Sequence, residues 1–242
     1  MFGKNFEKIN TKRNIKIIKN DFYKILNIVN TLDFSYFKLF INKNFFININ
    51  ERNFYLYLSN GSIELLNTSK KKENSYFAIK DKISFKTVTN IECFIFFQHN
   101  KKKINITRSN NLKISKLRVC KFKSSLKKYW GEIHTLFSNK KGACKIIVMR
   151  SFTQSSMEFH IYKKENYFIN NGILNLGIRY GKAEQKIIQL KKNDSFFMNV
   201  GIMHIRMTKK GTEIIEMSNK DSDYDSNIVH NGETYNFSLK DI

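Results

Sequence analysis

The stretch MEFHIYKKENYFINNG at residues 157–172, together with KKNDSFFMNVGIMH at residues 191–204, decides the fold of this chain. Glu158 and His160 are two residues apart, so on a β-strand their side chains point to the same face. The pair Asn171-Gly172 is typical of a hairpin turn, and we expect the strand to end there. The pattern indicates antiparallel strands joined by short turns.

Four side chains of this region have the chemistry to bind one metal ion. They are Glu158, His160, Glu165 and His204. Imidazole and carboxylate ligands suit zinc, manganese or iron, and an open position would be left for a substrate oxygen. A lone histidine between apolar residues is usually a core or surface residue, whereas this combination with glycines at the turns is harder to obtain by chance. We predict one divalent metal ion; the alternative is a site that has lost its metal and keeps the polar cluster.

These spacings resemble the two motifs of the cupin family, G-x5-H-x-H-x4-E-x6-G and G-x5-P-x-G-x2-H. The matching positions are His160, Glu165, Gly172, Gly201 and His204. Glu158 stands at the leading histidine position, and Asn193 and Asn199 stand where the second motif has glycine and proline. The resemblance covers about residues 126–232 and implies an all-β double-stranded β-helix, a jelly-roll-like barrel.

Within that family the chain is most similar to the cupin domain of mannose-6-phosphate isomerases and related sugar-phosphate proteins. Those domains begin with a Lys-Pro-Trp-Gly stretch, which reads here Lys128-Tyr129-Trp130-Gly131. Their leading metal ligand is glutamine, so Glu158 keeps an oxygen ligand and adds a charge. The resemblance implies a metal-dependent aldose–ketose isomerase acting on a sugar phosphate. A non-catalytic cupin that binds a sugar or nucleotide sugar, and a metal-dependent cupin oxygenase, stay open as alternatives.

Several charged residues are candidates for the chemistry of such an isomerase. A metal ion would stabilise the developing enediolate, and Glu158 is a candidate base if it is not a ligand. Arg206 follows His204 by two residues on the same expected strand, so it shares the face of that ligand. Arg179 and Lys182, in the loop of GIRYGKAEQK, are candidate ligands of a substrate phosphate. An exposed loop charge is the simpler interpretation of Lys182.

The first half of the chain carries a weaker copy of the same pattern. Residues 54–65 (FYLYLSNGSIEL) read like residues 166–176 (NYFINNGILNL), and Asp81 and Asp194 follow at similar distances. No histidine precedes His99, so this copy lacks the metal ligands. The repeat predicts two units, the N-terminal one degenerate. Chance similarity between two β-rich segments is the alternative.

The pattern along the chain predicts three parts. Residues 1–29 form a polar arm and a short helix, because the apolar residues of DFYKILNIVNTL recur at helical spacing. Residues 30–124 form the degenerate cupin-like β unit, with the basic stretch 99–125 as the linker. Residues 125–242 form the metal-binding cupin domain, in which we expect DSDYDS at residues 221–226 to be a solvated loop.

The net charge of +23 does not by itself indicate a nucleic-acid partner. Only seven of the 43 basic residues are arginine, and proline is absent, which fits an A- and T-rich codon usage that spreads lysine over the surface. No helix-turn-helix, zinc finger or RNA-binding motif accompanies the charge. We expect a small-molecule sugar phosphate or nucleotide sugar as ligand and no specific nucleic acid; a homodimer is compatible with the sequence.

The apolar segments and the cysteines suggest a compartment. No stretch has the length of a membrane-spanning helix, and the first residues lack the apolar core of a signal peptide. Cys93, Cys120 and Cys144 form no CxxC pair and are interpreted as buried free thiols of a reducing compartment. We expect a cytoplasmic protein with no membrane partner.

Overall fold

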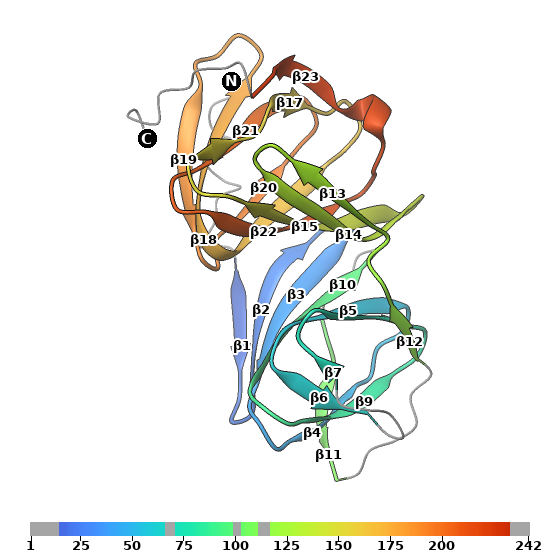
Figure 1. Cartoon of the computed structure of the whole chain (residues 1–242). Helices are drawn as coiled ribbons and strands as arrows, with labels where there is room; N and C mark the ends of the chain where they lie inside the picture. The colour runs from blue at the N-terminus through green and yellow to red at the C-terminus, as the bar shows by residue number, and fades with distance from the viewer. Residues whose placement is uncertain (1–14, 66–70, 99–102, 111–116, 233–242) are drawn as a thin grey trace. The chain divides into compact units, whose positions relative to one another are not determined.

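The computed structural model describes residues 15–65, 71–98, 103–110 and 117–232. Within these stretches one 3-10 turn, η2 (Asp223–Asp225), is the single helical element, and all other regular elements are β-strands. The prediction of an all-β fold is confirmed. The chain divides into two compact units, the first spanning residues 15–121 and the second beginning at Phe122 (Figure 1).

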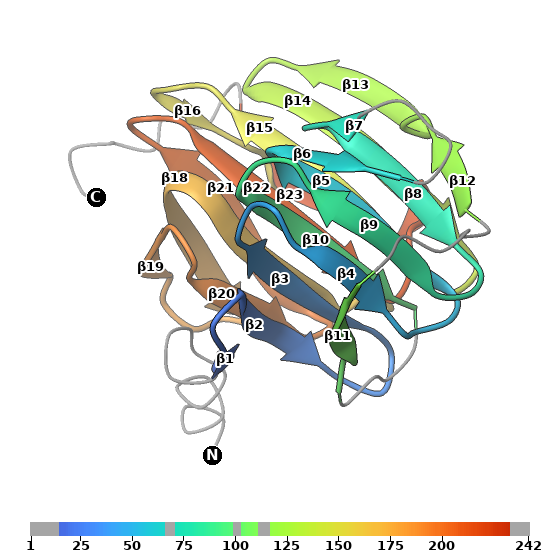
Figure 2. The same ribbon diagram turned by 90° about the horizontal axis from the view of Figure 1, so that it is seen from below.

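The first unit packs two sheets around an apolar core. Its strands are β1 (Lys16–Lys19), β2 (Tyr23–Asn30), β3 (Ser35–Ile41), β4 (Phe46–Ile49), β5 (Phe54–Asn60), β6 (Ser62–Glu64), β7 (Lys71–Lys72), β8 (Ser75–Ile79), β9 (Ile83–Thr87), β10 (Ile91–Phe97), β11 (Ile106–Ser109) and β12 (Leu117–Cys120). One sheet has the order β1-β2-β3-β10-β5-β8-β12 and the other has the order β11-β4-β9-β6-β7 (Figure 2). Phe37 and Leu56 of the first sheet meet Ile47 and Phe85 of the second in one buried cluster. Each such side chain stabilises the unit by about 1.5–3 kcal/mol.

The second unit curls one sheet into a barrel. Its strands are β13 (Ser124–Lys128), β14 (Gly131–Asn139), β15 (Gly142–Met149), β16 (Thr153–Gln154), β17 (Met157–Phe159), β18 (Glu165–Tyr180), β19 (Lys186–Lys191), β20 (Ser195–Met198), β21 (Ile202–Thr208), β22 (Thr212–Ser218) and β23 (Asn227–His230). The order β13-β14-β15-β22-β18-β21-β17-β23 brings β17 and β21 side by side. The first half of the 16-residue strand β18 pairs with β20 and β22, and its second half pairs with β19 and β21.

The two units repeat the same strand order. The run β2-β3-β10-β5-β8 of the first corresponds to β14-β15-β22-β18-β20 of the second. In each unit the register shifts by one residue where a strand leaves one layer for the other, at Ser59 and at Asn170. A glycine with positive φ follows, Gly61 at 87° and Gly172 at 80°. The prediction of a degenerate first unit and a cupin-like second unit is confirmed.

Gly172 does not make the hairpin turn that its sequence indicates. β18 continues through Asn171 and Gly172, and the left-handed glycine serves a bulge at which the strand bends into the second layer. A Cβ on Gly172 would lie 2.2 Å from the carbonyl oxygen of Gly211, so the close approach of the two backbones also requires glycine. A hairpin turn and a bulge both need a positive φ at this glycine, so the sequence does not distinguish the two.

The helix expected before residue 30 is a strand. Residues 23–30 form β2, which pairs along its length with β3. A register shift between Asn27 and Val29 breaks the alternation of the strand, so Ile25, Leu26, Ile28 and Val29 are all buried. An alternation interrupted in this way produces the i, i+3, i+4 spacing that predicted a helix. The part of the expected arm before residue 15 lies outside the described residues.

The basic stretch 99–125 is not a simple linker. β11 pairs with β4 and β12 pairs with β8, so both strands belong to the sheets of the first unit. The boundary between Lys121 and Phe122 is close to the expected one after Ser124. Throughout the described ranges, no helix has the length and apolar character needed to cross a membrane.

Candidate metal centre

The barrel of the second unit brings all four predicted ligands together. Glu158 of β17 lies opposite His204 of β21 in the strand register, and His160 follows the end of β17. One ligand atom from each of these three residues lies within 4.8 Å of the others. Oε1 of Glu165, at the start of β18, lies 3.0 Å from Nε2 of His204 and 3.8 Å from Nε2 of His160. The spacing of the sequence motif thus produces a convergent cluster.

Both histidines direct Nε2 into this cluster. Nδ1 of His160 is 2.7 Å from the carbonyl oxygen of Asp225, and Nδ1 of His204 is 3.1 Å from that of Ile202. Because a carbonyl oxygen only accepts, each Nδ1 carries a proton, which directs Nε2 of both rings into the cluster, where a metal ion would take its lone pair. Nε2 of His160 makes no hydrogen bond within the described residues, and Nε2 of His204 faces Oε1 of Glu165 at 3.0 Å. Backbone carbonyls fix metal-binding histidines in the same way, so the donor set fits a metal ion.

Glu165 divides its carboxylate between the histidines and a lysine. Oε1 faces the two Nε2 atoms, whereas Oε2 lies 2.5 Å from Nζ of Lys163. Nζ of Lys163 also donates to Glu216 at 2.7 Å. Lys163, Glu165 and Glu216 are all buried. A buried ammonium between two carboxylates is the expected way to keep all three charged away from water.

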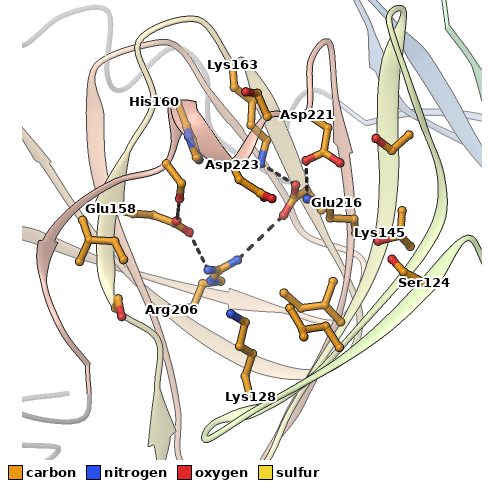
Figure 3. A pocket seen from close by; sticks show the side chains of 18 of the residues that line it. Ser124, Lys128, Lys145, Glu158, His160, Lys163, Arg206, Glu216, Asp221 and Asp223 are labelled. Carbon is orange, nitrogen blue, oxygen red and sulfur yellow. Dashed lines mark hydrogen bonds and ion pairs between the residues drawn. The ribbon is translucent and has the colours of Figure 1, made fainter.

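Arg206 closes these ion pairs into a ring. Its Nη2 lies 2.8 Å from Oε1 of Glu158, and its Nη1 lies 3.9 Å from Oε2 of Glu216 (Figure 3). The same Glu158 oxygen is 3.7 Å from Nε2 of His204. Carboxylates and basic side chains therefore alternate around the barrel interior. The order of the ring is Glu158, Arg206, Glu216, Lys163, Glu165 and His204.

The neighbours of each titratable group shift its pKa strongly. Burial works to raise the pKa of Glu158, but Arg206 and His204 outweigh it and lower the pKa to about 2. Burial works to lower the pKa of His204, but Glu165 and Glu158 outweigh it and raise the pKa above its ordinary value. Lys163 and the histidines hold the pKa of Glu165 well below its usual range, against the effect of burial. Both candidate carboxylate ligands are thus ionised at neutral pH.

The packing of Arg206 explains why its charge is tolerated in the interior. The guanidinium lies over the rings of Trp130 and Tyr167, at 5.4 Å and 5.7 Å from their centroids. Its Nε and Nη1 donate to Ser155 and Tyr167. The expected shared face of Arg206 and His204 agrees with this geometry, since both reach Glu158.

The segment expected to be a solvated loop instead supports the site. Asp225 of η2 is buried, and its carboxylate accepts hydrogen bonds from the backbone N–H groups of residues 161–163. Its carbonyl accepts the Nδ1 proton of His160, and the hydroxyl of Ser226 donates to Glu158. The prediction of a solvated loop is wrong for this residue, because its carboxylate compensates backbone donors of a distant turn.

A cavity of about 440 Å³ opens beside the cluster (Figure 3). Glu158, His160 and Arg206 line one side of it, and residues of β13 and β14 line another. Arg179 and Lys182 do not line it: they lie at the β18–β19 hairpin, where Nε of Arg179 donates to the carbonyl of Gly181. Their proposed contact with a substrate phosphate stays a prediction that this cavity does not support.

Sequence reasoning missed the residues that connect the ligands. Lys163, Tyr167, Glu216 and Asp225 each contact a candidate ligand or a neighbour of one. Two of them carry a signal in the sequence. Lys163 is two residues before Glu165 and therefore shares its face, and Glu216 is a charged residue inside the apolar strand TEIIEMS. Asp225 carries no such signal, because its partners lie 62–65 residues away.

The repeated strand order, the bulged crossing strands and the polar cluster in one barrel define a two-unit cupin fold.

No family model and no curated protein matches the sequence. Solved structures do match. A variant of Bacillus subtilis oxalate decarboxylase superposes with a TM-score of 0.66 at 8% identity, over 87% of this chain and 76% of that one. Lactobacillus farciminis oxalate decarboxylase, in a formate complex, gives 0.65 at 8% identity, over 91% and 87%.

At this identity the similarity shows the fold alone. It confirms the cupin architecture expected from the motif spacing. The resemblance to mannose-6-phosphate isomerases is not shown by these structures and stays a prediction.

Proposed function

We propose that the second unit binds one divalent metal ion through His160, His204, Glu165 and Glu158 and acts on a small oxygen-rich anion. The observation that carries the proposal is the pair of buried Nε2 atoms, which converge on one oxygen of ionised Glu165 at 3.8 Å and 3.0 Å. Zinc, manganese and iron all accept this mixture of nitrogen and oxygen ligands.

Each residue of the ring has a role in this proposal. When bound, the metal ion would supply a Lewis acid that polarises a carbonyl or carboxylate oxygen. Glu158 serves as an oxygen ligand rather than a general base, because a carboxyl group with a pKa of about 2 has little affinity for a proton. Lys163 and Arg206 hold Glu165 and Glu158 in position.

Two substrate classes follow from separate observations. The resemblance around Lys128-Tyr129-Trp130-Gly131 favours a sugar phosphate and an isomerase. The two solved structures named above are oxalate decarboxylases, which favours a small carboxylate instead. Assays of the metal-loaded protein with mannose 6-phosphate and with oxalate, followed by NMR, would separate the two. A non-catalytic binding protein would convert neither.

The metal site is tested by the metal content of histidine variants. We expect the parent protein to bind about one equivalent, measured by plasma mass spectrometry after loading and desalting. His160→Ala and His204→Ala should each weaken binding by roughly tenfold or more, because one of the nitrogen ligands is lost. His134→Ala is the matched control: this histidine lies in the same unit but makes a surface contact with Ser125.

Two results would contradict the proposal. The first is that the parent protein takes up no zinc, manganese or iron. The second is that His160→Ala and His204→Ala retain as much metal as His134→Ala. Circular dichroism of each variant establishes that a loss of metal is not a loss of fold.

A further inference from the structure

The wall of the cavity opposite His160 is built by an edge strand. Ser124, Leu126 and Lys128 alternate along β13 and line the cavity, because every second side chain of a strand points to the same face. Lys127, between them, points to the other face and does not line the cavity. Figure 3 shows Lys128 extending into the cavity below Arg206.

Lys128 differs from the other lysines around the cavity. Lys145 is paired with Asp221 at 2.6 Å, and Lys163 is held by its two glutamates. Lys123 donates to the carbonyl oxygen of Ser138 at 2.7 Å. The ammonium of Lys128 has no ion-pair or hydrogen-bond partner within the described part of the chain. It is therefore the cation that is available to a ligand.

The charged side chains that line the cavity carry no excess of negative charge. Five of them are cationic and four are carboxylates. The cations are Lys123, Lys128, Lys145, Lys163 and Arg206, and the carboxylates are Glu158, Glu216, Asp221 and Asp223; Glu165 does not line the cavity and is paired with Lys163. A divalent metal ion would add two positive charges to this set. Since uncompensated charge in a partly buried site is costly, the loaded site favours a ligand that carries negative charge.

We propose that the cavity binds a small dianion between the metal ion and Lys128, with one oxygen group on the metal and the other on the lysine. The inference rests on the proposed metal site and adds to it the chemical class of the ligand and its anchoring residue. Dicarboxylates and phosphate esters share this chemistry. The residues of β13 are exposed, so Lys128 is accessible to a ligand from solvent.

The test is calorimetric titration of the metal-loaded protein with oxalate and, separately, with inorganic phosphate. We expect one dianion to bind per metal ion, and Lys128→Met to weaken that binding roughly tenfold through the loss of a charge-assisted contact. Lys127→Met is the matched control, because it removes the same charge from the adjacent residue of the same strand. Its affinity should stay within about twofold of the parent, as expected for a screened surface charge. A preference for oxalate would assign a carboxylate ligand, and a preference for phosphate would assign a phosphate ester.

The metal content of the same samples separates this inference from the metal site itself. Three results, each obtained at full metal occupancy, would overturn the dianion site alone. The parent would bind no dianion, or Lys128→Met and Lys127→Met would bind the dianion with equal affinity. The third is a dianion affinity that stays the same after the metal is removed. No metal uptake by the parent would overturn both.

Discussion

Lys163 is the residue that makes a carboxylate-rich barrel interior stable. Its ammonium lies between Glu165 and Glu216, and burial would favour loss of its proton, but the two carboxylates outweigh burial and raise its pKa above the ordinary value. The lysine therefore stays charged. It also orients Glu165: Oε2 is paired with Lys163, so Oε1 faces the histidines.

Replacing Lys163 should expose the cost of these carboxylates. We expect Lys163→Met to lower the free energy of unfolding of the metal-free protein by about 3–5 kcal/mol, because two buried carboxylates lose their partner. A bound divalent ion would compensate Glu165 and recover part of this loss. Urea denaturation with and without zinc measures both effects, and zinc should stabilise Lys163→Met more than the parent.

Lys182→Met provides the comparison for this prediction. Lys182 is exposed in the β18–β19 hairpin, and its loss should change the unfolding free energy by no more than about 0.5 kcal/mol. The interpretation of Lys163 would be wrong if its replacement had an effect as small as that of Lys182.

The candidate ligands were predictable from the sequence, whereas not all of their supports were. Glu158, His160 and Glu165 are close in the chain, so strand periodicity alone places them near one another. Asp225 contacts the same turn from a distant part of the chain, and only the folded structure identifies its partners. Residues that act through non-local backbone contacts carry no local pattern.

At the scale of the element, bulges explain two of the errors in the predicted elements. At the bulge in β2 the buried residues have the spacing of an amphipathic helix. At the bulge in β18 the sequence contains an Asn-Gly pair, which is typical of a hairpin turn. Alternation is preserved in strands whose pairing is regular, such as β3 and β10. A single extra residue in a strand reverses which face the next side chains occupy, and the period-2 signal is lost at that point.

The bulge of β18 makes a specific prediction about its glycine. Gly172→Ala should lower the free energy of unfolding by about 3 kcal/mol or more, since a positive φ costs about 1–2 kcal/mol for alanine and the new methyl group meets a backbone oxygen. Chemical denaturation measures the loss.

Gly181→Ala separates these two causes. Gly181 also has a positive φ, but a Cβ there would contact no atom within 4 Å. Its replacement should cost only about 1–2 kcal/mol. Equal losses for the two variants would show that the close approach at Gly172 has no energetic consequence.

At the scale of the whole molecule, the duplication was visible because the same local pattern occurs twice. Residues 54–65 and 166–176 both contain the bulge and the glycine, so their similarity records a shared geometry. The order of the strands was not visible, since it depends on pairing between distant segments. The family resemblance supplied that order for the second unit.

The thiols allow a test of the burial of both cores. Burial, and next to it Glu92, raises the pKa of Cys93 to about 12, and burial raises the pKa of Cys144 well above its usual value. Because the thiolate is the reactive form, neither should react with a maleimide in the folded protein. Cys120 is partly exposed and should react within minutes. Mass spectrometry should find one modified cysteine before denaturation and three after it; rapid native labelling of Cys93 or Cys144 would contradict the structure.

The path of β18 has a consequence for how the second unit opens. Its amides are shared between both layers, with β20 and β22 along one half and with β19 and β21 along the other. An edge strand such as β13 or β23 is able to fray alone. Separating either layer, however, breaks the pairing of β18, and β18 also pairs with the strands of the other layer. The two layers therefore exchange their backbone protons as one cooperative block, in which the slowest hydrogens lie along β18 and β22.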